Sequence, residues 1–294
     1  MLPAAALLTA VVAVTVLASF GVRLAGRPTG GSPGPGGRPA AEAGTAGAPP
    51  AAAPARPQPP PDEIRGSRVR HLAVPILMYH VIAPVRRDAA YPGLFVSPAR
   101  FAGQMRALER AGYRGVTLQR VWDAWHRGTP LPRRPVVVSF DDGFMGDYTR
   151  ALPVLRSLGW PGVLNLKIDA MKDPGNLRPT HIRGLMKAGW EIDPHSITHP
   201  DLTTLGATQL QREVAGSRRR LRREFGIPAD FFCYPSGRFD DRVVAAVRAA
   251  GYRAATTVEP GLATPEQPFT LPRLRVIDGD SGRTLLGKIA ARAH

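Results

Sequence analysis

The sequence has a single cysteine, Cys233, among its 294 residues. One thiol cannot form an intramolecular disulfide, and it excludes zinc or iron–sulfur sites built from several cysteines. Acidic residues are also few: the sequence has 23 of them and 39 lysines and arginines. All but 4 of these basic residues are arginine. The resulting formal charge of +16 suggests an anionic partner, which would be either a nucleic acid or an anionic surface.

Charged residues are missing from one long stretch, which runs from Leu2 to Val22. In a helix that rises about 1.5 Å per residue, this stretch is long enough to cross a hydrocarbon core of roughly 30 Å. We therefore expect residues 1–26 to be a signal anchor or a signal peptide. The segment Val16-Leu17-Ala18 is typical of a cleavage site, but we favour an uncleaved anchor. Either segment predicts an extracytoplasmic protein, anchored in the membrane at the cell surface or secreted.

Large apolar side chains are scarce from residue 27 to residue 62, where eleven of the 31 prolines lie among glycine and alanine. This composition cannot bury enough apolar surface to offset the entropy lost on ordering. We expect residues 27–70 to be a disordered, semi-extended linker and residues 71–294 to form the folded domain.

Within residues 71–294, short apolar runs alternate with helical patterns. The predicted strands are 74–79, 135–140, 163–166, 190–192, 231–234 and 253–256. The predicted helices are 98–111, 147–157, 182–188, 207–225 and 240–250. Repeated strand–helix units indicate an α/β fold with a parallel sheet, which at this length favours a barrel.

Two adjacent carboxylates, Asp141 and Asp142, follow the most apolar predicted strand and precede Gly143. Active sites of α/β barrels lie at the carboxyl ends of the strands, so acidic residues there are well placed to bind a metal ion or to act as a base. The alternative is a solvated turn, because Asp-Asp-Gly is common turn chemistry.

Two histidines, His195 and His199, follow the predicted strand 190–192. Imidazoles at this spacing can bind one ion together with a carboxylate, although an isolated pair is more often two unrelated histidines. Asp193 and Pro194 precede them, and we expect Asp193 to be a turn residue rather than a group that orients a histidine.

Together, Ser139-Phe140-Asp141-Asp142-Gly143 and His195-Ser196-Ile197-Thr198-His199 resemble the first two motifs of the polysaccharide deacetylases, the NodB-like carbohydrate esterase family 4. The similarity covers about residues 72–276. It implies a deformed (β/α) barrel that removes N-acetyl groups from N-acetylglucosamine-containing polymers of the cell surface or cell wall. It also implies a divalent metal bound by Asp142, His195 and His199, with Asp141 as general base.

The third family motif, usually Arg-x-Pro-Tyr-Gly, reads Cys233-Tyr234-Pro235-Ser236-Gly237 here. Ser236 takes the position whose backbone N–H binds the developing oxyanion in the family. A backbone donor survives a change of side chain, so we expect this role to persist. By the same resemblance, we expect Tyr234 and Pro235 to contact substrate.

The family arginine that holds the catalytic aspartate is missing, and Cys233 stands in its place. We expect Cys233 to be a small buried side chain. Arg273 and Arg275 are candidates to replace the arginine, and Arg273 is also a candidate for substrate binding. The alternative for both arginines is ordinary surface charge.

The family's last motif, Leu-x-His, is missing as well. The segment Pro75-Ile76-Leu77-Met78-Tyr79-His80 instead resembles a subgroup that includes the poly-β-1,6-N-acetylglucosamine deacetylases. In that subgroup the motif order is permuted, and a histidine in this segment acts as general acid. The resemblance therefore implies that His80 protonates the leaving sugar nitrogen, with a core histidine as the alternative.

The chemistry of amide hydrolysis fits these assignments. A divalent cation can lower the pKa of its water to about 7, Asp141 can accept the proton of that water, and Ser236 N–H can stabilise the oxyanion. Histidine and aspartate ligands suit zinc, with cobalt, nickel or iron as alternatives.

Other functions stay open at this point. The same site could hydrolyse O-acetyl groups of a xylan-like glycan, or the domain could be a catalytically silent glycan-binding module. We do not expect nucleic acid as a partner, because no recognition motif is visible and the expected compartment is wrong. The arginines in residues 218–223 form either a solvated helix face or a patch for anionic envelope polymers.

Overall fold

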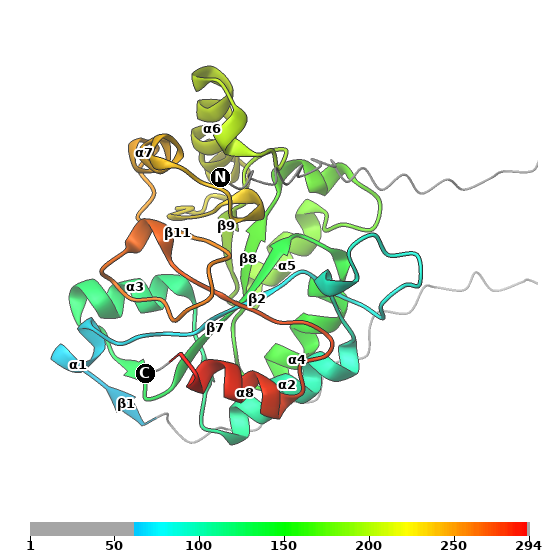
Figure 1. Ribbon diagram of the computed structural model, residues 1–294, viewed down its shortest axis with the longest axis vertical. Helices are drawn as coiled ribbons and strands as arrows, with labels where there is room; N and C mark the ends of the chain where they lie inside the picture. Colours follow the sequence, from blue (N-terminus) through cyan, green and yellow to red (C-terminus); the bar gives the residue numbers. More distant parts are fainter. Residues whose placement is uncertain (1–61, 293–294) are drawn as a thin grey trace, which may run out of the picture. The chain divides into compact units, whose positions relative to one another are not determined.

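The computed structural model describes residues 62–292 (Figure 1). The hydrophobic segment expected over residues 1–26 and the first part of the expected linker lie outside these residues. Among the described helices, none combines the length and the apolar character that crossing a membrane requires. Folded structure begins before residue 71, because β1 (Glu63–Ile64) pairs with β6 (Leu131–Pro132), and the short helix α1 (Ser67–Arg70) buries Val69.

Most strands of the domain run parallel. They are β2 (Ile76–Tyr79), β3 (Val81–Ile82), β4 (Phe95–Val96), β5 (Arg114–Gly115), β7 (Pro135–Asp142), β8 (Val163–Leu166), β9 (Glu191–Pro194), β10 (Phe231–Cys233), β11 (Ala254–Thr256) and β12 (Leu274–Arg275). The central sheet has the order β12-β2-β7-β8-β9, and β5 joins it by pairing with the start of β7. The strands β10 and β11 form a separate parallel pair, as do β3 and β4.

The two parallel units form an incompletely closed barrel. A parallel bridge from Thr256 to Leu271 links β11 to the segment that leads into β12. On the other side, no backbone ladder joins β9 to β10 anywhere in residues 62–292. This interruption, which we call the β9–β10 seam, is the deformation of the barrel, and the mostly parallel α/β architecture is the one expected from the sequence.

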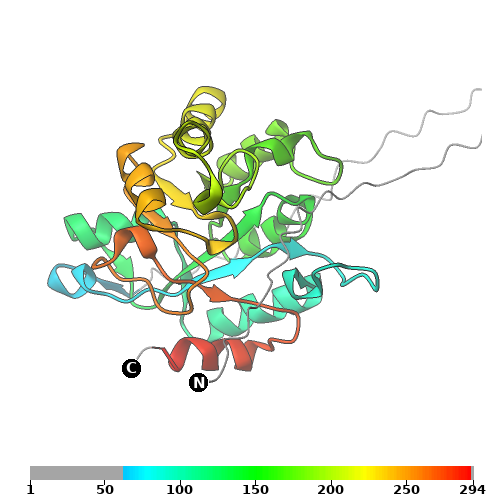
Figure 2. The ribbon, with the colours of Figure 1, turned by 45° about the horizontal axis from the view of Figure 1, so that its top comes forward.

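Helices cover the outside of the sheet. They are α2 (Pro98–Arg110), α3 (Leu118–Arg127), α4 (Leu152–Ser157), α5 (Pro179–Lys187), α6 (Ala207–Phe225), α7 (Asp241–Ala249) and α8 (Gly282–Ala290), with a π-helical turn at Asp147–Ala151. In Figures 1 and 2, α6 and α7 lie over the part of the domain that carries β9 and β11, whereas α2, α4 and α8 gather on the opposite side. The sequence patterns did not predict α3, α8 or β12.

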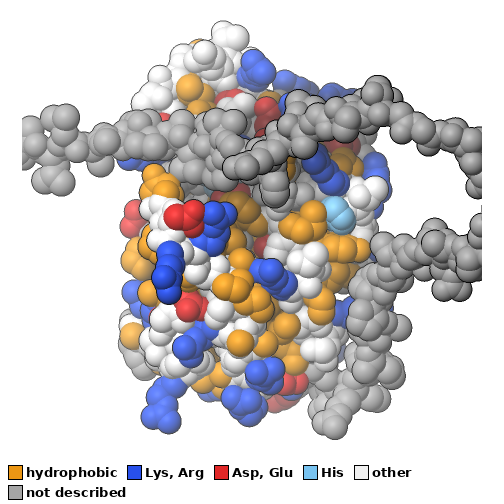
Figure 3. All heavy atoms as spheres, turned by 90° about the vertical axis from the view of Figure 1, so that its right-hand side faces the viewer, with side chains coloured by type: hydrophobic (Ala, Val, Ile, Leu, Met, Phe, Trp, Pro, Cys, Tyr) orange, Lys and Arg blue, Asp and Glu red, His pale blue; other side chains and the backbone are white. Residues whose placement is uncertain are grey.

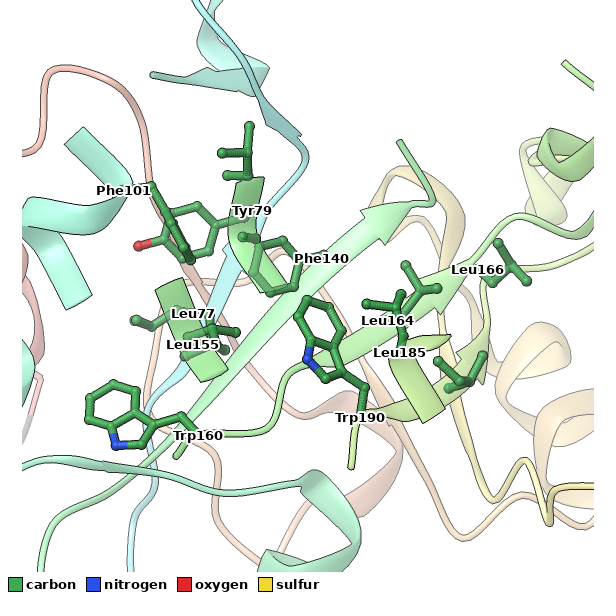
Figure 4. Close-up of a cluster of buried hydrophobic side chains, with 14 of the residues drawn as sticks. Leu77, Tyr79, Phe101, Phe140, Leu155, Trp160, Leu164, Leu166, Leu185 and Trp190 are labelled. Atoms are coloured by element: carbon green, nitrogen blue, oxygen red, sulfur yellow. The ribbon is translucent and has the colours of Figure 1, made fainter. Parts of the chain in front are cut away.

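Strand β7 shows how the core is divided. Its outward face, with Phe140 near the end, packs under the helices in a large apolar cluster. Phe140 stacks between Tyr79 and Trp190, with ring centroids 5.6 Å and 5.0 Å away (Figure 4). The inward face begins with Val137 in a second apolar cluster and continues to Asp141. Because side chains alternate along a strand, one strand supports the outer core and also presents a carboxylate to the barrel mouth.

The arginine-rich helix α6 gives several of its cations structural contacts. Arg218 pairs with Asp230 at 3.0 Å and donates to the carbonyl oxygens of Ala229 and Ala250. Arg220 pairs with Glu224 one turn further along α6. On the face shown in Figure 3, lysine and arginine side chains are spread out rather than gathered in one patch.

Candidate active site

Four polar side chains form a layer at the carboxyl ends of adjacent strands. Asp141 on β7 is in register with Asn165 on β8, which is in register with Asp193 on β9. His80 follows β2 directly, one residue beyond the register pair of Tyr79 and Phe140, so it lies next to Asp141. Paired residues of parallel strands point to the same side, and the contact from Asn165 to Asp141 shows that this side is the barrel interior.

Asp141 is held by Arg273 through two parallel hydrogen bonds. Nη1 and Nη2 of the guanidinium each donate to one carboxylate oxygen at 2.8 Å, and Asn165 donates to Oδ1 at 2.7 Å. Burial alone would raise the pKa of Asp141, but the charge of Arg273 outweighs burial and holds that pKa well below its usual range. Arg273 thus takes the place of the arginine missing at Cys233, and Asp141 stays ionised.

Asp142 faces the same site because the backbone leaves the strand pattern there. Consecutive strand residues normally point to opposite faces, but Asp142 has a φ of 77°, in the left-handed region that residues other than glycine rarely adopt. His199 has a φ of 65°. Such conformations cost free energy and concentrate at functional sites, so the backbone is strained where the three expected metal ligands converge.

The expected metal ligands have the spacing that an ion requires. The Nε2 atoms of His195 and His199 lie 3.1 Å apart, and Oδ1 of Asp142 lies 3.9 Å and 3.8 Å from them. The point in the plane of these three atoms that is equidistant from them lies about 2.1 Å from each, the usual length of a zinc–nitrogen or zinc–oxygen bond. The donor set therefore fits a divalent cation such as zinc. Asp141, His195 and Cys233 also lie close together, but Arg273 already engages that carboxylate.

The loop that carries both histidines is fixed by hydrogen bonds to buried groups. Glu213 on α6 accepts the N–H groups of Ile197 and Thr198 at 2.8 Å and 2.9 Å. His195 Nδ1 lies 2.8 Å from the carbonyl oxygen of Cys233, which can only accept, so Nδ1 carries the hydrogen. This tautomer leaves the lone pair of Nε2 directed at the metal position.

Two side chains bridge the β9–β10 seam where a backbone ladder is missing. Asp193 Oδ1 accepts the N–H of Phe231 at 3.2 Å, and His195 donates to Cys233 two residues further along β10. Asp193 is buried within β9, so the expectation that it is a turn residue is wrong. It does not touch His195 directly, but it attaches the strand whose carbonyl oxygen orients that imidazole.

The sequence profile of the polysaccharide deacetylase family matches residues 128–255, which contain both the Asp-Asp motif and the histidine pair. The chain therefore contains a polysaccharide deacetylase domain. The resemblance in the two motifs is thereby confirmed, and the deacetylase domain has the fold of its family.

Three relatives show the extent of this similarity. A Bacillus subtilis (strain 168) protein with a provisional polysaccharide deacetylase name, YxkH, is 29% identical over 210 residues, which cover 71% of this chain and 73% of that protein. The poly-β-1,6-N-acetyl-D-glucosamine N-deacetylase of Escherichia coli (strain K12) is 32% identical over 87 residues, 30% of this chain and 13% of that protein. The structure of a polysaccharide deacetylase from Bacillus cereus is 28% identical, with a TM-score of 0.67 over 74% of this chain and 69% of that one.

The two histidines of the deacetylase site have opposite pKa shifts. Burial lowers the pKa of His195, but its contacts with Cys233 and the carboxylates of Asp141 and Asp142 outweigh burial and raise it. Burial and the neighbouring charge of His195 lower the pKa of His199. Without an ion, the imidazole pair therefore carries one proton more than two neutral rings near neutral pH, and a divalent cation must displace that extra proton from Nε2 to bind.

His80 lies at the edge of the site. Its Nε2 is 3.8 Å from Oδ2 of Asp141, and its side chain is 14% exposed. Burial lowers the pKa of His80, although Asp141 and Asp142 partly oppose this effect. His80 is therefore mostly neutral at neutral pH, and it can act as an acid once it has received a proton.

The segment after β10 exposes Ser236 and buries its two ring side chains. Ser236 is exposed and has a φ of 53°. The side chains of Tyr234 and Pro235 are buried, and the Tyr234 hydroxyl donates to the carbonyl oxygen of Phe269. Arg273 is buried as well. Packing and the Asp141 ion pair hold the side chains of Tyr234, Pro235 and Arg273 inside the domain, and their contact with substrate stays a prediction.

Sequence reasoning missed Glu213 and Asn165, which support the histidine loop and Asp141. Glu213 left a signal, because it falls on the apolar face of α6 beside Leu210 and Val214. A carboxylate on a buried face requires hydrogen-bond partners, here the two loop N–H groups. Asn165 left a weaker signal, as a single polar residue within the apolar strand β8.

Proposed function

We propose that this domain removes N-acetyl groups from an N-acetylglucosamine-containing polysaccharide of the cell surface or cell wall, using a divalent metal held by Asp142, His195 and His199. One observation carries the proposal. Three donor atoms surround a point at zinc-bond distance, directly beside a buried carboxylate that Arg273 keeps ionised. Zinc suits these ligands best, with cobalt, nickel and iron as alternatives.

Asp141 accepts the proton of the attacking water. The charge of Arg273 keeps this carboxylate ionised, so that it can accept a proton, but also makes it a weak base. The pKa of the attacking water must therefore be lowered. A bound divalent cation supplies that chemistry by lowering the pKa of a water to about 7 and by polarising the substrate carbonyl. Asn165 and Arg273 fix the orientation of Asp141 while the proton moves.

The other two groups act on the amide itself. As water oxygen attacks the carbonyl carbon, Ser236 N–H donates to the oxygen that becomes negative, and a donor in such a position contributes about 3–4 kcal/mol. The carbon–nitrogen bond then breaks, and His80, which must first take up a proton from the solvent, gives that proton to the leaving nitrogen. The products are acetate and a free amine on the sugar.

The substrate class follows from the relatives rather than from the site. The Escherichia coli relative is named for N-deacetylation of poly-β-1,6-N-acetyl-D-glucosamine, and its similarity includes only part of each chain. Such a polymer lies outside the cytoplasm, in agreement with the N-terminal anchor or signal peptide proposed for residues 1–26. Exposed arginines of α6 are proposed to meet an anionic envelope polymer.

The test is acetate release from three substrates: β-1,4 and β-1,6 N-acetylglucosamine oligomers and acetylated xylan. We expect release from an N-acetylglucosamine oligomer, its loss with chelator, and a decrease of about 10²- to 10⁴-fold in Asp141→Asn, the range of general-base catalysis. Release from xylan alone would instead assign an O-acetyl esterase. No release from any substrate, with zinc bound, would favour a silent glycan-binding module.

A further inference from the structure

Lys167 follows β8 at the mouth of the barrel. The pairing of β8 with β9 continues past both strands, because His195 N–H donates to the Leu166 carbonyl at 2.9 Å and Ile168 N–H donates to the Ser196 carbonyl at 3.2 Å. The first bond continues the register of the ladder, and the second reaches one residue further along the histidine loop, so Lys167 lies opposite His195 and Ser196.

The Lys167 side chain points into the site. Its backbone is extended, with φ −67° and ψ 114°, so the alternation of strand side chains continues through this residue. Asn165, two positions earlier, faces the barrel interior and donates to Asp141. Lys167 therefore lies above Asn165 on the inward face and beside the histidine pair.

The ammonium group of Lys167 has no protein counter-ion. Its side chain is half-buried, and neither an ion pair nor a hydrogen bond engages it within residues 62–292. The cations nearby differ, since Arg273 pairs with Asp141 and Lys172 pairs with Asp169 at 2.7 Å. An anion that enters the site is therefore the natural partner of Lys167.

A cation at this position would weaken metal binding unless an anion compensates it. Lys167 is close enough to His199 for a coulombic interaction between the two side chains, so its charge acts on the expected metal ligands. Deacetylation converts a neutral amide into acetate, and an acidic glycan would carry carboxylates of its own. Either carboxylate could accept a charge-assisted hydrogen bond from the ammonium group.

We propose that Lys167 binds a carboxylate at the mouth of the site, either the acetate product or an acidic substituent of the glycan. This proposal rests on the proposed deacetylase function. It adds a binding residue outside the family motifs, and it names the ligand chemistry as a carboxylate.

The first experiment titrates acetate into the full-length, zinc-loaded protein by calorimetry. The variant Lys167→Met keeps a long apolar side chain and removes the charge, whereas Lys167→Arg keeps the charge. Lys172→Met is the matched control, because it removes a paired lysine from the same segment. If acetate is the ligand, Lys167→Met weakens acetate binding about tenfold, the effect of losing one charge-assisted hydrogen bond, and the other two variants match the wild type.

The second experiment compares KM for a neutral N-acetylglucosamine oligomer and for one of equal length that carries carboxylates. A rise in KM of about tenfold for the acidic oligomer alone, with unchanged acetate affinity, assigns the site to a glycan substituent. Unchanged acetate affinity and unchanged KM values in Lys167→Met overturn the proposal. A wild-type protein that releases no acetate from either oligomer refutes the proposed function instead, whereas the acetate titration still tests Lys167.

Discussion

The carboxylates and the histidines of the site stand on two walls that are joined differently. On the carboxylate wall, continuous parallel ladders connect β2, β7 and β8. On the histidine wall, β9 and β10 meet at a seam where the side chains of Asp193 and His195 replace the ladder among the described residues. The backbone therefore joins the carboxylate wall on both sides, whereas the histidine wall has a ladder only toward β8 and side-chain contacts toward β10.

This difference predicts where substitutions act. On the carboxylate wall, the backbone ladders hold the geometry. The main free-energy cost there is the burial of the charge of Asp141, which Arg273 offsets. On the histidine wall, loss of one hydrogen bond should move a metal ligand. Changes of charge should therefore alter stability on the first wall, and changes of hydrogen bonding should alter metal affinity on the second.

The largest expected effect comes from Arg273→Met. This change leaves Asp141 buried without its cation, and the free energy of unfolding should fall by about 3–5 kcal/mol at pH 7. In the wild type, the pKa of Asp141 is lower in the folded state than in the unfolded state, where it is about 4. The ionised carboxylate therefore stabilises the folded state above about pH 4, and this contribution is lost as the pH falls. In the variant, folding must protonate the carboxylate, so the deficit should shrink below pH 4.

Urea unfolding at several pH values measures this effect. The double variant Arg273→Met with Asp141→Leu is the control, because it removes the stranded charge and should recover much of the lost stability. A deficit that does not depend on pH would show that Arg273 acts through packing alone.

The sharpest comparison of the walls is Asp193→Ala against Asn165→Ala. Loss of Asp193 should let β10 shift and disorient His195, so zinc affinity should fall about 10- to 100-fold, the usual effect of removing a residue that supports a ligand. Asn165 stands on the ladder wall, and its loss should change zinc affinity by less than about threefold. Asp193→Asn, which can still accept from Phe231, should resemble the wild type. Equal losses for both alanine variants would contradict the distinction between the walls.

The histidine wall should also respond to pH. A divalent cation must displace the proton shared by His195 and His199, so zinc affinity should rise with pH by up to about tenfold per unit while one proton is released. Calorimetric titrations in buffers of different ionisation enthalpy count this proton. Zinc binding without proton release between pH 6 and 8 would contradict the proposed ligand pair.

The smallest expected effect belongs to Ser236→Ala. Because the proposed donor is the backbone N–H, acetate release should stay within about threefold of the wild type, far from the 10²- to 10³-fold lost when an oxyanion donor is removed. Steady-state kinetics on an N-acetylglucosamine oligomer provides the measurement. A loss of a hundredfold or more with unchanged thermal stability would show that the hydroxyl itself takes part.

The sequence predicted the residues of the carboxylate wall better than those of the β9–β10 seam. Apolar runs and a strand-end Asp-Asp-Gly are local signals, and they located β7, β8 and the convergence of Asp142 with the histidines. The sequence could not identify the cation that pairs with Asp141, because Arg273 lies 132 residues away in the chain. The local sequence pattern also does not distinguish Arg273 from Arg275. Asp193 was misassigned for a similar reason, since a carboxylate before proline resembles a turn unless the N–H of Phe231 is known to face it.

One measurement tests the central claim, that Asp142, His195 and His199 hold a metal that drives deacetylation. Metal-stripped protein is titrated with zinc while acetate release from an N-acetylglucosamine oligomer is followed. We expect release to rise linearly and to reach its plateau at one zinc per chain in the wild type, and to stay at background in Asp142→Ala. Full release from the stripped protein, or an unchanged titration in Asp142→Ala, would contradict the account.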